Sequence, residues 1–208
     1  MTERRGPSQI CRKMHVLPNE NRKTRMRRIA LDVETTGITL NDGHRIIEIA
    51  CLEIVSDGCQ PLRFYTKLNP EREIDPSATA AHGYTRQLLN DAPLFTEVAP
   101  ALLSFIKGAE LVIHNAPFDI GFLNAELRQA RLPSIDSVCD VTDTYLIARD
   151  LHPGQINNLN ALCDRYGVPK GPKPTGAQQD VEKVAQIYLM MTGKSENVWA
   201  VPAKTAKG

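Results

Sequence analysis

The sequence has 208 residues, 42% of them apolar, which is enough for one domain with a substantial hydrophobic core. No apolar run approaches the length of a membrane span, and the five cysteines show no C-x-x-C spacing, which argues against a zinc site or a disulfide framework. We therefore expect a soluble, cytoplasmic protein with reduced thiols. The net charge of +1 is uneven, because residues 1–28 contain nine basic side chains and two acidic ones. We expect a disordered basic extension at 1–25, one domain at 26–193 and a flexible tail at 194–208.

Hydrophobic periodicity predicts an ordered series of strands and helices. Alternating patterns at 27–34, 44–56 and 62–68, separated by short turns, favour three strands in an antiparallel meander. Further along, the pattern predicts helices at 95–107, 118–127, 143–150, 157–166 and 177–191, with short strands at 111–113 and 136–142. This order indicates a single α/β domain, in which helices flank a five-stranded mixed sheet.

Two carboxylates follow the first apolar strand, in the stretch D-V-E-T-T-G. Side chains alternate along a strand, so Asp32 and Glu34 are expected on one face and Leu31 and Val33 on the other. Like charges that close repel each other unless a cation lies between them. The pair is either a solvated strand end or part of a divalent-metal site, and carboxylates from elsewhere in the chain would decide between the two.

Two later aspartates are candidates to join that pair. Asp119 follows the fourth strand in the first turn of a helix, where the positive helix end alone would also favour a carboxylate. Asp180 shares the inward stripe of the last helix with Val184, Ile187 and Met191, and a carboxylate on an apolar face needs a proton, a partner or a metal. The four carboxylates would supply hard oxygen ligands suited to Mg²⁺ or Mn²⁺. Two such ions about 4 Å apart can catalyse phosphodiester cleavage.

Three motifs carry a family resemblance: D-V-E-T-T-G at 32–37, H-N-A-P-F-D-I-G-F at 114–122 and G-A-x-x-D at 176–180. With them the chain resembles the DEDD-type (DnaQ-like) 3′–5′ exonucleases, and most of all the epsilon proofreading subunits of bacterial DNA polymerase III. The resemblance runs in order over roughly residues 27–193. It implies an RNase H-like fold that binds two Mg²⁺ or Mn²⁺ ions through Asp32, Glu34, Asp119 and Asp180.

The chain departs from the family at the general base. In the His-bearing branch a histidine precedes the last aspartate by five residues, and here Thr175 has that position. The Tyr-bearing branch would need a tyrosine at 176, which is a glycine. A threonine hydroxyl cannot accept a proton near neutral pH, and general-base catalysis contributes about 10²–10⁴-fold. We therefore expect retained metal binding with reduced cleavage, whether Thr175 is natural or engineered.

The resemblance also implies residues near the substrate, which are Thr35, Thr36, Gly37, His82, His114, Asn115 and Phe118. On the residues alone, a local structural role is favoured for His82, whereas for Asn115 a turn-capping role fits as well as a role near the substrate. His114 could help to position a phosphate, and Phe118 with Phe122 could stack on bases. His152, in a loop before a helix, is a weaker candidate for a replacement base.

Three functions remain open from the sequence. The first is a metal-dependent exonuclease that proofreads single-stranded or frayed DNA 3′ ends, with alpha-like and theta-like polymerase III subunits as partners and no membrane. The second is a nuclease-derived module that holds nucleic acid or braces a polymerase without cutting. The third is a stand-alone exonuclease for RNA or oligonucleotides. Four retained carboxylates argue against the second, whereas the missing histidine argues against full activity.

Overall fold

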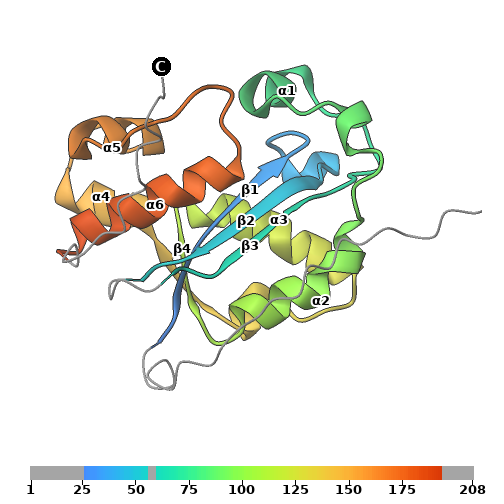
Figure 1. The fold of residues 1–208 in the computed structure, drawn as a ribbon, viewed down its shortest axis with the longest axis horizontal. Helices are drawn as coiled ribbons and strands as arrows, with labels where there is room; N and C mark the ends of the chain where they lie inside the picture. The colour runs from blue at the N-terminus through green and yellow to red at the C-terminus, as the bar shows by residue number, and fades with distance from the viewer. Residues whose placement is uncertain (1–25, 56–59, 194–208) are drawn as a thin grey trace, which may run out of the picture.

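Five strands form one mixed sheet in the order β3-β2-β1-β4-β5 (Figure 1). The computed structural model describes residues 26–55 and 60–193, so the predicted basic extension at 1–25 and tail at 194–208 lie outside the described residues. Strands β1, β2 and β3 are antiparallel neighbours, as the meander prediction requires, whereas β4 and β5 run parallel to β1. The strands are β1 (Arg28–Thr35), β2 (Ile46–Glu53), β3 (Arg63–Lys67), β4 (Glu110–Ile113) and β5 (Asp140–Asp143).

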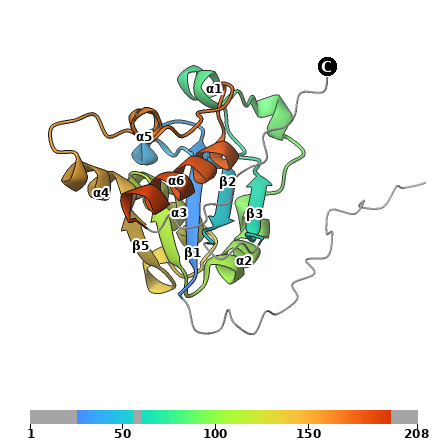
Figure 2. The same ribbon diagram turned by 60° about the vertical axis from the view of Figure 1, so that its left-hand side comes forward.

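Helices cover both faces of the sheet. Figure 2 shows α6 across one face, with α4 and α5 beside it, and α2 and α3 against the other face. The helices are α1 (Pro76–His82), α2 (Phe95–Ile106), α3 (Ala116–Gln129), α4 (Thr144–Leu151), α5 (Leu159–Tyr166) and α6 (Ala177–Met191). The prediction of an α/β domain with a five-stranded mixed sheet is therefore confirmed. No helix among residues 26–55 and 60–193 is long and apolar enough to cross a membrane.

The alternation along β1 divides the hydrophobic core into two layers. Ile29, Leu31 and Val33 are buried in a cluster with side chains of α2 and α3. Ala30 points the other way, into a cluster with side chains of α6. Because side chains two residues apart share a face, Asp32 and Glu34 continue the row of Ala30 and face the α6 layer. The same pattern that builds the core therefore aims both carboxylates at the last helix.

The parallel pairing of β1 with β4 brings a second site segment to the same place. Ala30 is the register partner of Val112, so β1 and β4 end at the same edge of the sheet. The chain leaves β4 there and turns into α3 through Asn115, whose left-handed backbone has φ 66°. Ligand sites gather at such carboxyl ends of parallel strands. Asp119, in the first turn of α3, is therefore delivered beside β1.

Several predicted boundaries were wrong. Helix α1 and the 3₁₀ turn Arg86–Leu89 were not predicted, since both are too short to show an amphipathic period. The fifth strand was expected at 136–142 but begins at Asp140, because Ile135–Ser137 form a 3₁₀ turn instead. The second strand is also shorter than the predicted 44–56, and its expected end overlaps residues outside the described part of the chain.

Candidate functional site

Three carboxylates from two elements converge at the edge where β1 meets α6. Ligand oxygens of Asp32, Glu34 and Asp180 all lie within 4.8 Å of one another. The first two stand on one face of β1, and Asp180 lies in the first turn of α6. Residues separated by almost 150 positions in the sequence thus form one acidic cluster, with the spacing expected of ligands to a divalent cation.

Asp119 completes the acidic cluster from a third element. Its side chain is 3% exposed, and its Oδ1 accepts a hydrogen bond from the backbone N–H of Val33 at 3.0 Å. Val33 lies between Asp32 and Glu34, so this bond holds α3 against the carboxylate-bearing part of β1. The structure thus brings together all four carboxylates that the sequence singled out.

Burial and like charges make the ionised form of the acidic cluster unfavourable in the protein alone. Burial raises the pKa of Glu34 to about 8, and the charges of Asp180, Glu48 and Asp119 add to this rise. Burial likewise raises the pKa of Asp119 to about 8, although its bond from Val33 opposes the shift. Burial, followed by the charge of Asp119, raises the pKa of Asp32 well above its usual value. Carboxylates in such a place need protons or a cation. Carboxylate oxygens are hard donors, and a divalent ion such as Mg²⁺ or Mn²⁺ fits a cluster of them.

Glu48 was not singled out from the sequence, yet it connects the acidic cluster to its surroundings. It is the register partner of Glu34 on β2 and is 1% exposed. Its Oε1 accepts hydrogen bonds from the hydroxyls of Tyr65 at 2.7 Å and Tyr84 at 2.8 Å, and its Oε2 accepts one from the backbone N–H of Ala177 at 2.9 Å. Because Ala177 is the first residue of α6, Glu48 anchors the helix end that carries Asp180. Alternation along β2 could have identified it as a neighbour of Glu34.

Lys183 was also missed, and it lies inside the acidic cluster. Its side chain is 5% exposed, and its Nζ lies 2.6 Å from Oδ1 of Asp180. In the sequence it follows Glu182 and resembles a surface lysine, so its inward direction emerges only from the packing of α6.

Thr175 lies in the loop that leads into α6, two residues before the first helical residue, and is partly buried. The preceding Pro174 packs against Gly83 at the end of α1, where a Cβ would come within 2.8 Å of the proline ring. This contact ties the loop to the end of α1. The side chain of Thr175 ends in a hydroxyl, which does not accept a proton near neutral pH.

The histidines are engaged in local contacts. Nδ1 of His114 pairs with the Thr144 hydroxyl at 3.0 Å, and burial lowers its pKa while the charges of Asp143 and Asp180 oppose that shift. Nδ1 of His82 accepts a hydrogen bond from the backbone N–H of Tyr84, and the two rings stack. Nε2 of His152 pairs with the hydroxyl of Tyr166 at 2.8 Å, between α4 and α5. The charge of Asp180 thus acts on the pKa of His114.

The threonines and glycine after the acidic pair shape the turn that leaves β1. The Thr35 hydroxyl donates to the carbonyl of Gly37 at 2.7 Å, and the fully buried Thr36 hydroxyl pairs with Nδ1 of His44 at 3.0 Å. A Cβ on Gly37 would overlap the His44 ring, so a glycine is required there. These contacts support a structural role and leave a substrate-binding role for these residues as an expectation.

Asp143 holds the segment of Asn115 and was missed from the sequence. Its carboxylate accepts hydrogen bonds from the backbone N–H groups of Asn115 at 3.0 Å, Ala116 at 3.1 Å and Tyr145 at 2.8 Å. One side chain therefore caps the starts of both α3 and α4. Its place directly before a helix is the signal that could have identified it. Phe118 packs against Phe122, with ring centroids 4.9 Å apart, and remains partly accessible beside this segment.

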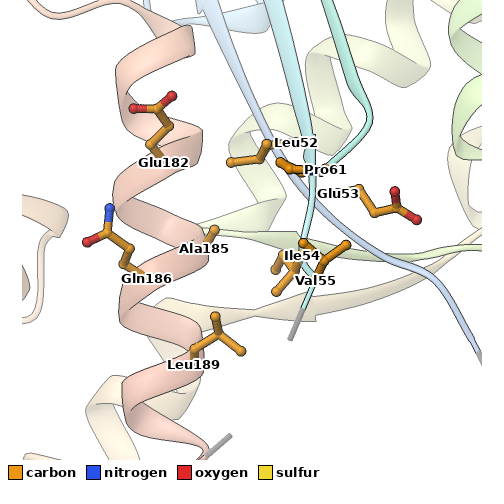
Figure 3. A pocket seen from close by; sticks show the side chains of 9 residues that line it. All are labelled: Leu52, Glu53, Ile54, Val55, Pro61, Glu182, Ala185, Gln186 and Leu189. Carbon is orange, nitrogen blue, oxygen red and sulfur yellow. The ribbon is translucent and has the colours of Figure 1, made fainter. Parts of the chain in front are cut away.

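A separate pocket lies farther along α6 and carries no comparable chemistry. Figure 3 shows it between α6 and the end of β2. Its two acidic residues are paired already, Glu53 with Arg27 at 3.2 Å and Glu182 with Arg63 at 2.8 Å. It is lined by Leu52, Glu53, Ile54, Val55, Pro61, Glu182, Ala185, Gln186 and Leu189. The acidic cluster is therefore the stronger candidate for the functional site.

Comparison with known proteins agrees with this geometry. The family described as Exonuclease (RNase_T) matches residues 29–188. The chain is similar to the DNA polymerase III subunit epsilon of Haemophilus influenzae, with 44% identity over 179 residues that cover 83% of this chain and 70% of the relative. It is similarly related to the epsilon subunit of Escherichia coli, with 42% identity over 174 residues that cover 80% and 72% of the two chains.

Solved structures share the fold. Exonuclease X in complex with 5′-overhanging duplex DNA has 26% sequence identity and a TM-score of 0.60, over 82% of this chain and 94% of that one. The nuclease domain of 3′hExo, a DEDDh family member bound to rAMP, has a TM-score of 0.71 over 85% and 96% of the two chains. At 16% identity the second likeness concerns the fold alone. The RNase H-like architecture expected from the motifs is thus confirmed.

Proposed function

This chain belongs to the exonuclease family, among the relatives of the DNA polymerase III epsilon subunits, and we propose that it removes nucleotides from single-stranded or mismatched DNA 3′ ends during replication. The observation that carries the proposal is the convergence of Asp32, Glu34 and Asp180 within 4.8 Å, with Asp119 bonded to Val33 between the first two. Burying four carboxylates together costs folding free energy, and a bound divalent cation would offset that cost.

We propose that the four carboxylates hold two Mg²⁺ or Mn²⁺ ions. When bound, these ions would supply positive charge that stabilises the phosphodiester under attack and lowers the pKa of a water. The protein's own residues would orient the reacting groups. Val33 fixes Asp119, Glu48 fixes the start of α6 that carries Asp180, and Asp143 fixes the turn that presents Asn115.

Cleavage is proposed to be slow, because Thr175 occupies the general-base position of this family. Among the described histidines, His152 offers no replacement, because its Nε2 is bound to the Tyr166 hydroxyl at 2.8 Å. A rate reduced by about 10²–10⁴-fold is expected for a missing general base. Metal binding is proposed to persist, since the carboxylates are all present.

The proposal extends to organisation and partners. We propose that residues 26–193 form the exonuclease domain, and that it acts in the cytoplasm beside alpha-like and theta-like polymerase III subunits. Two observations favour a second candidate, a module that binds a DNA 3′ end without cutting it. Thr175 offers no base, and Lys183 already places one positive charge on Asp180.

A time course with end-labelled single-stranded DNA and RNA in Mn²⁺ tests these functions. We expect stepwise shortening of DNA from its 3′ end, abolished by EDTA and by Asp180→Asn. Binding of DNA without shortening would favour the non-cutting module instead. Faster shortening of RNA than of DNA would favour an RNA exonuclease.

A further inference from the structure

Lys183 is a buried cation on the face of α6 that meets the sheet. Its side chain is 5% exposed, and its Nζ lies 2.6 Å from Oδ1 of Asp180, one helical turn earlier. Burial and the neighbouring carboxylates raise the pKa of Glu34, and the Lys183 ammonium is close enough to oppose that rise. The ammonium is therefore directed into the acidic cluster. A lysine is almost never fully buried unless it is paired, so the acidic cluster is what holds Lys183 inside.

Other ion pairs of α6 and its neighbours have a different setting. Glu182, also on α6, pairs with Arg63 of β3 at 2.8 Å, but these two side chains are 32% and 34% exposed. Lys170 pairs with Asp164 at the surface, where the two side chains are 39% and 68% exposed. Lys183 differs because its partner Asp180 is one of the three carboxylates gathered within 4.8 Å. Its charge lies where a divalent ion would also be attracted.

We propose that Lys183 is an internal cation that competes with divalent metal for Asp180 and so weakens metal binding at this end of the cluster. The inference rests on the proposed metal site. Two positive charges that share one carboxylate repel each other, and the repulsion is strong where water is scarce. Asp180 keeps its place without the lysine, because its backbone belongs to α6 and Glu48 anchors the start of that helix. In the metal-free protein, Lys183 offsets repulsion among the carboxylates.

The test compares Lys183→Met with Arg63→Met. Each variant loses one positive charge and one ion pair to α6, but only the first loses a charge beside Asp180. Calorimetric titration of the metal-free proteins with Mn²⁺ gives the affinity, and thermal melts in EDTA give the stability. We expect Lys183→Met to bind Mn²⁺ at least about tenfold more tightly than the wild type and to melt at a lower temperature in EDTA. Arg63→Met should bind Mn²⁺ as the wild type does.

The outcomes separate the lysine from the metal site itself. If the wild type and Lys183→Met bind Mn²⁺ equally, or the variant binds more weakly, the competition is refuted and the metal site stands. A lower melting temperature with unchanged affinity would mark a purely structural ion pair and would also refute it. If neither protein binds Mn²⁺, the proposed function fails together with this inference. Lys183→Gln, which keeps a polar head, provides the same comparison if the methionine variant does not fold.

Discussion

The proposed reaction requires a proton acceptor and metal ligands. Thr175 stands at the family's position for the first, and Asp32 is one of the second. Thr175 lies on the loop before α6 and has a hydroxyl that cannot act as a base near neutral pH. Asp32 belongs to the acidic cluster, where burial, followed by the charge of Asp119, raises its pKa well above the usual value. A substitution of Thr175 should therefore change cleavage while it leaves the carboxylates intact, whereas a substitution of Asp32 should change metal binding.

Restoring the base should accelerate cleavage. Thr175→His is expected to raise the single-turnover rate on a mismatched DNA 3′ end at least about tenfold in Mg²⁺, because the histidine would stand at the family's general-base position. Thr175→Gln, of comparable length but without a basic nitrogen, serves as the control and should leave the rate unchanged. Equal rates for the histidine and glutamine variants would show that the loop does not present residue 175 to the substrate.

Removing one charge from the acidic cluster should have opposite effects with and without metal. Asp32→Asn is expected to raise the melting temperature in EDTA at pH 8 by about 2–4 °C, corresponding to relief of about 1 kcal/mol of repulsion. The same variant should lose the stabilisation that millimolar Mn²⁺ gives to the wild type by mass action. Melts with and without Mn²⁺ measure both quantities. A wild-type protein that Mn²⁺ does not stabilise would contradict the metal site.

At the level of elements, the position of α6 decides whether the acidic cluster exists. The helix starts at Ala177, whose backbone N–H is bound by the buried Glu48 of β2. The preceding Gly176 lets the two approach, since a Cβ there would lie 2.7 Å from Oε2 of Glu48. The backbone of Gly176 is in the extended region, so the constraint is steric and not conformational.

A methyl group at residue 176 should therefore weaken the site. Gly176→Ala is expected to cost about 1–3 kcal/mol of unfolding free energy by overpacking, and to weaken Mn²⁺ binding because the start of α6 must shift. Gly121→Ala is the matched control. Gly121 lies within α3, and a Cβ there would be 3.7 Å from the Leu40 side chain, an ordinary van der Waals distance. This control should be stabilised by up to about 1 kcal/mol through helix propensity. Denaturant unfolding and Mn²⁺ titration of both variants check the prediction.

At the scale of the whole molecule, the acidic cluster makes stability depend on pH. The pKa values of Glu34 and Asp119 are about 8 in the folded protein, well above those of the unfolded chain. Between these values the folded state binds more protons than the unfolded state, so stability decreases as pH rises. Burial lowers the pKa of His82 and His114, which has the opposite effect near and below pH 6.5.

We therefore expect the melting temperature in EDTA to fall as pH rises from about 6.5 to 8.5. Millimolar Mn²⁺ should flatten this dependence, because the cation replaces the protons on the carboxylates. Thermal melts across this range, with Asp32→Asn as the variant with the weaker dependence, measure the effect. A melting temperature in EDTA that is constant or rises over the range would show that the carboxylates are not strained in the folded protein.

The sequence by itself determined the local parts of this protein. Period-two alternation placed Asp32 and Glu34 on one face of β1, and helical spacing placed Asp180 on the inward side of α6. Both depend on neighbours only a few residues away. The ordered motifs added the fold class and the family. Short elements such as α1 escaped prediction, because a single helical turn or two has too few residues to show a period.

The tertiary structure alone decided what surrounds the carboxylates. Glu48 meets the start of α6 across 129 residues of sequence, and Asp119 meets Val33 across 86. Lys183 has the sequence context of a surface residue, and only the packing of α6 against the sheet turns it inward to Asp180. Local patterns show which way a side chain points along its own element. They do not show which distant group it meets, because that depends on how the elements pack, and this packing decides the charge balance of the site.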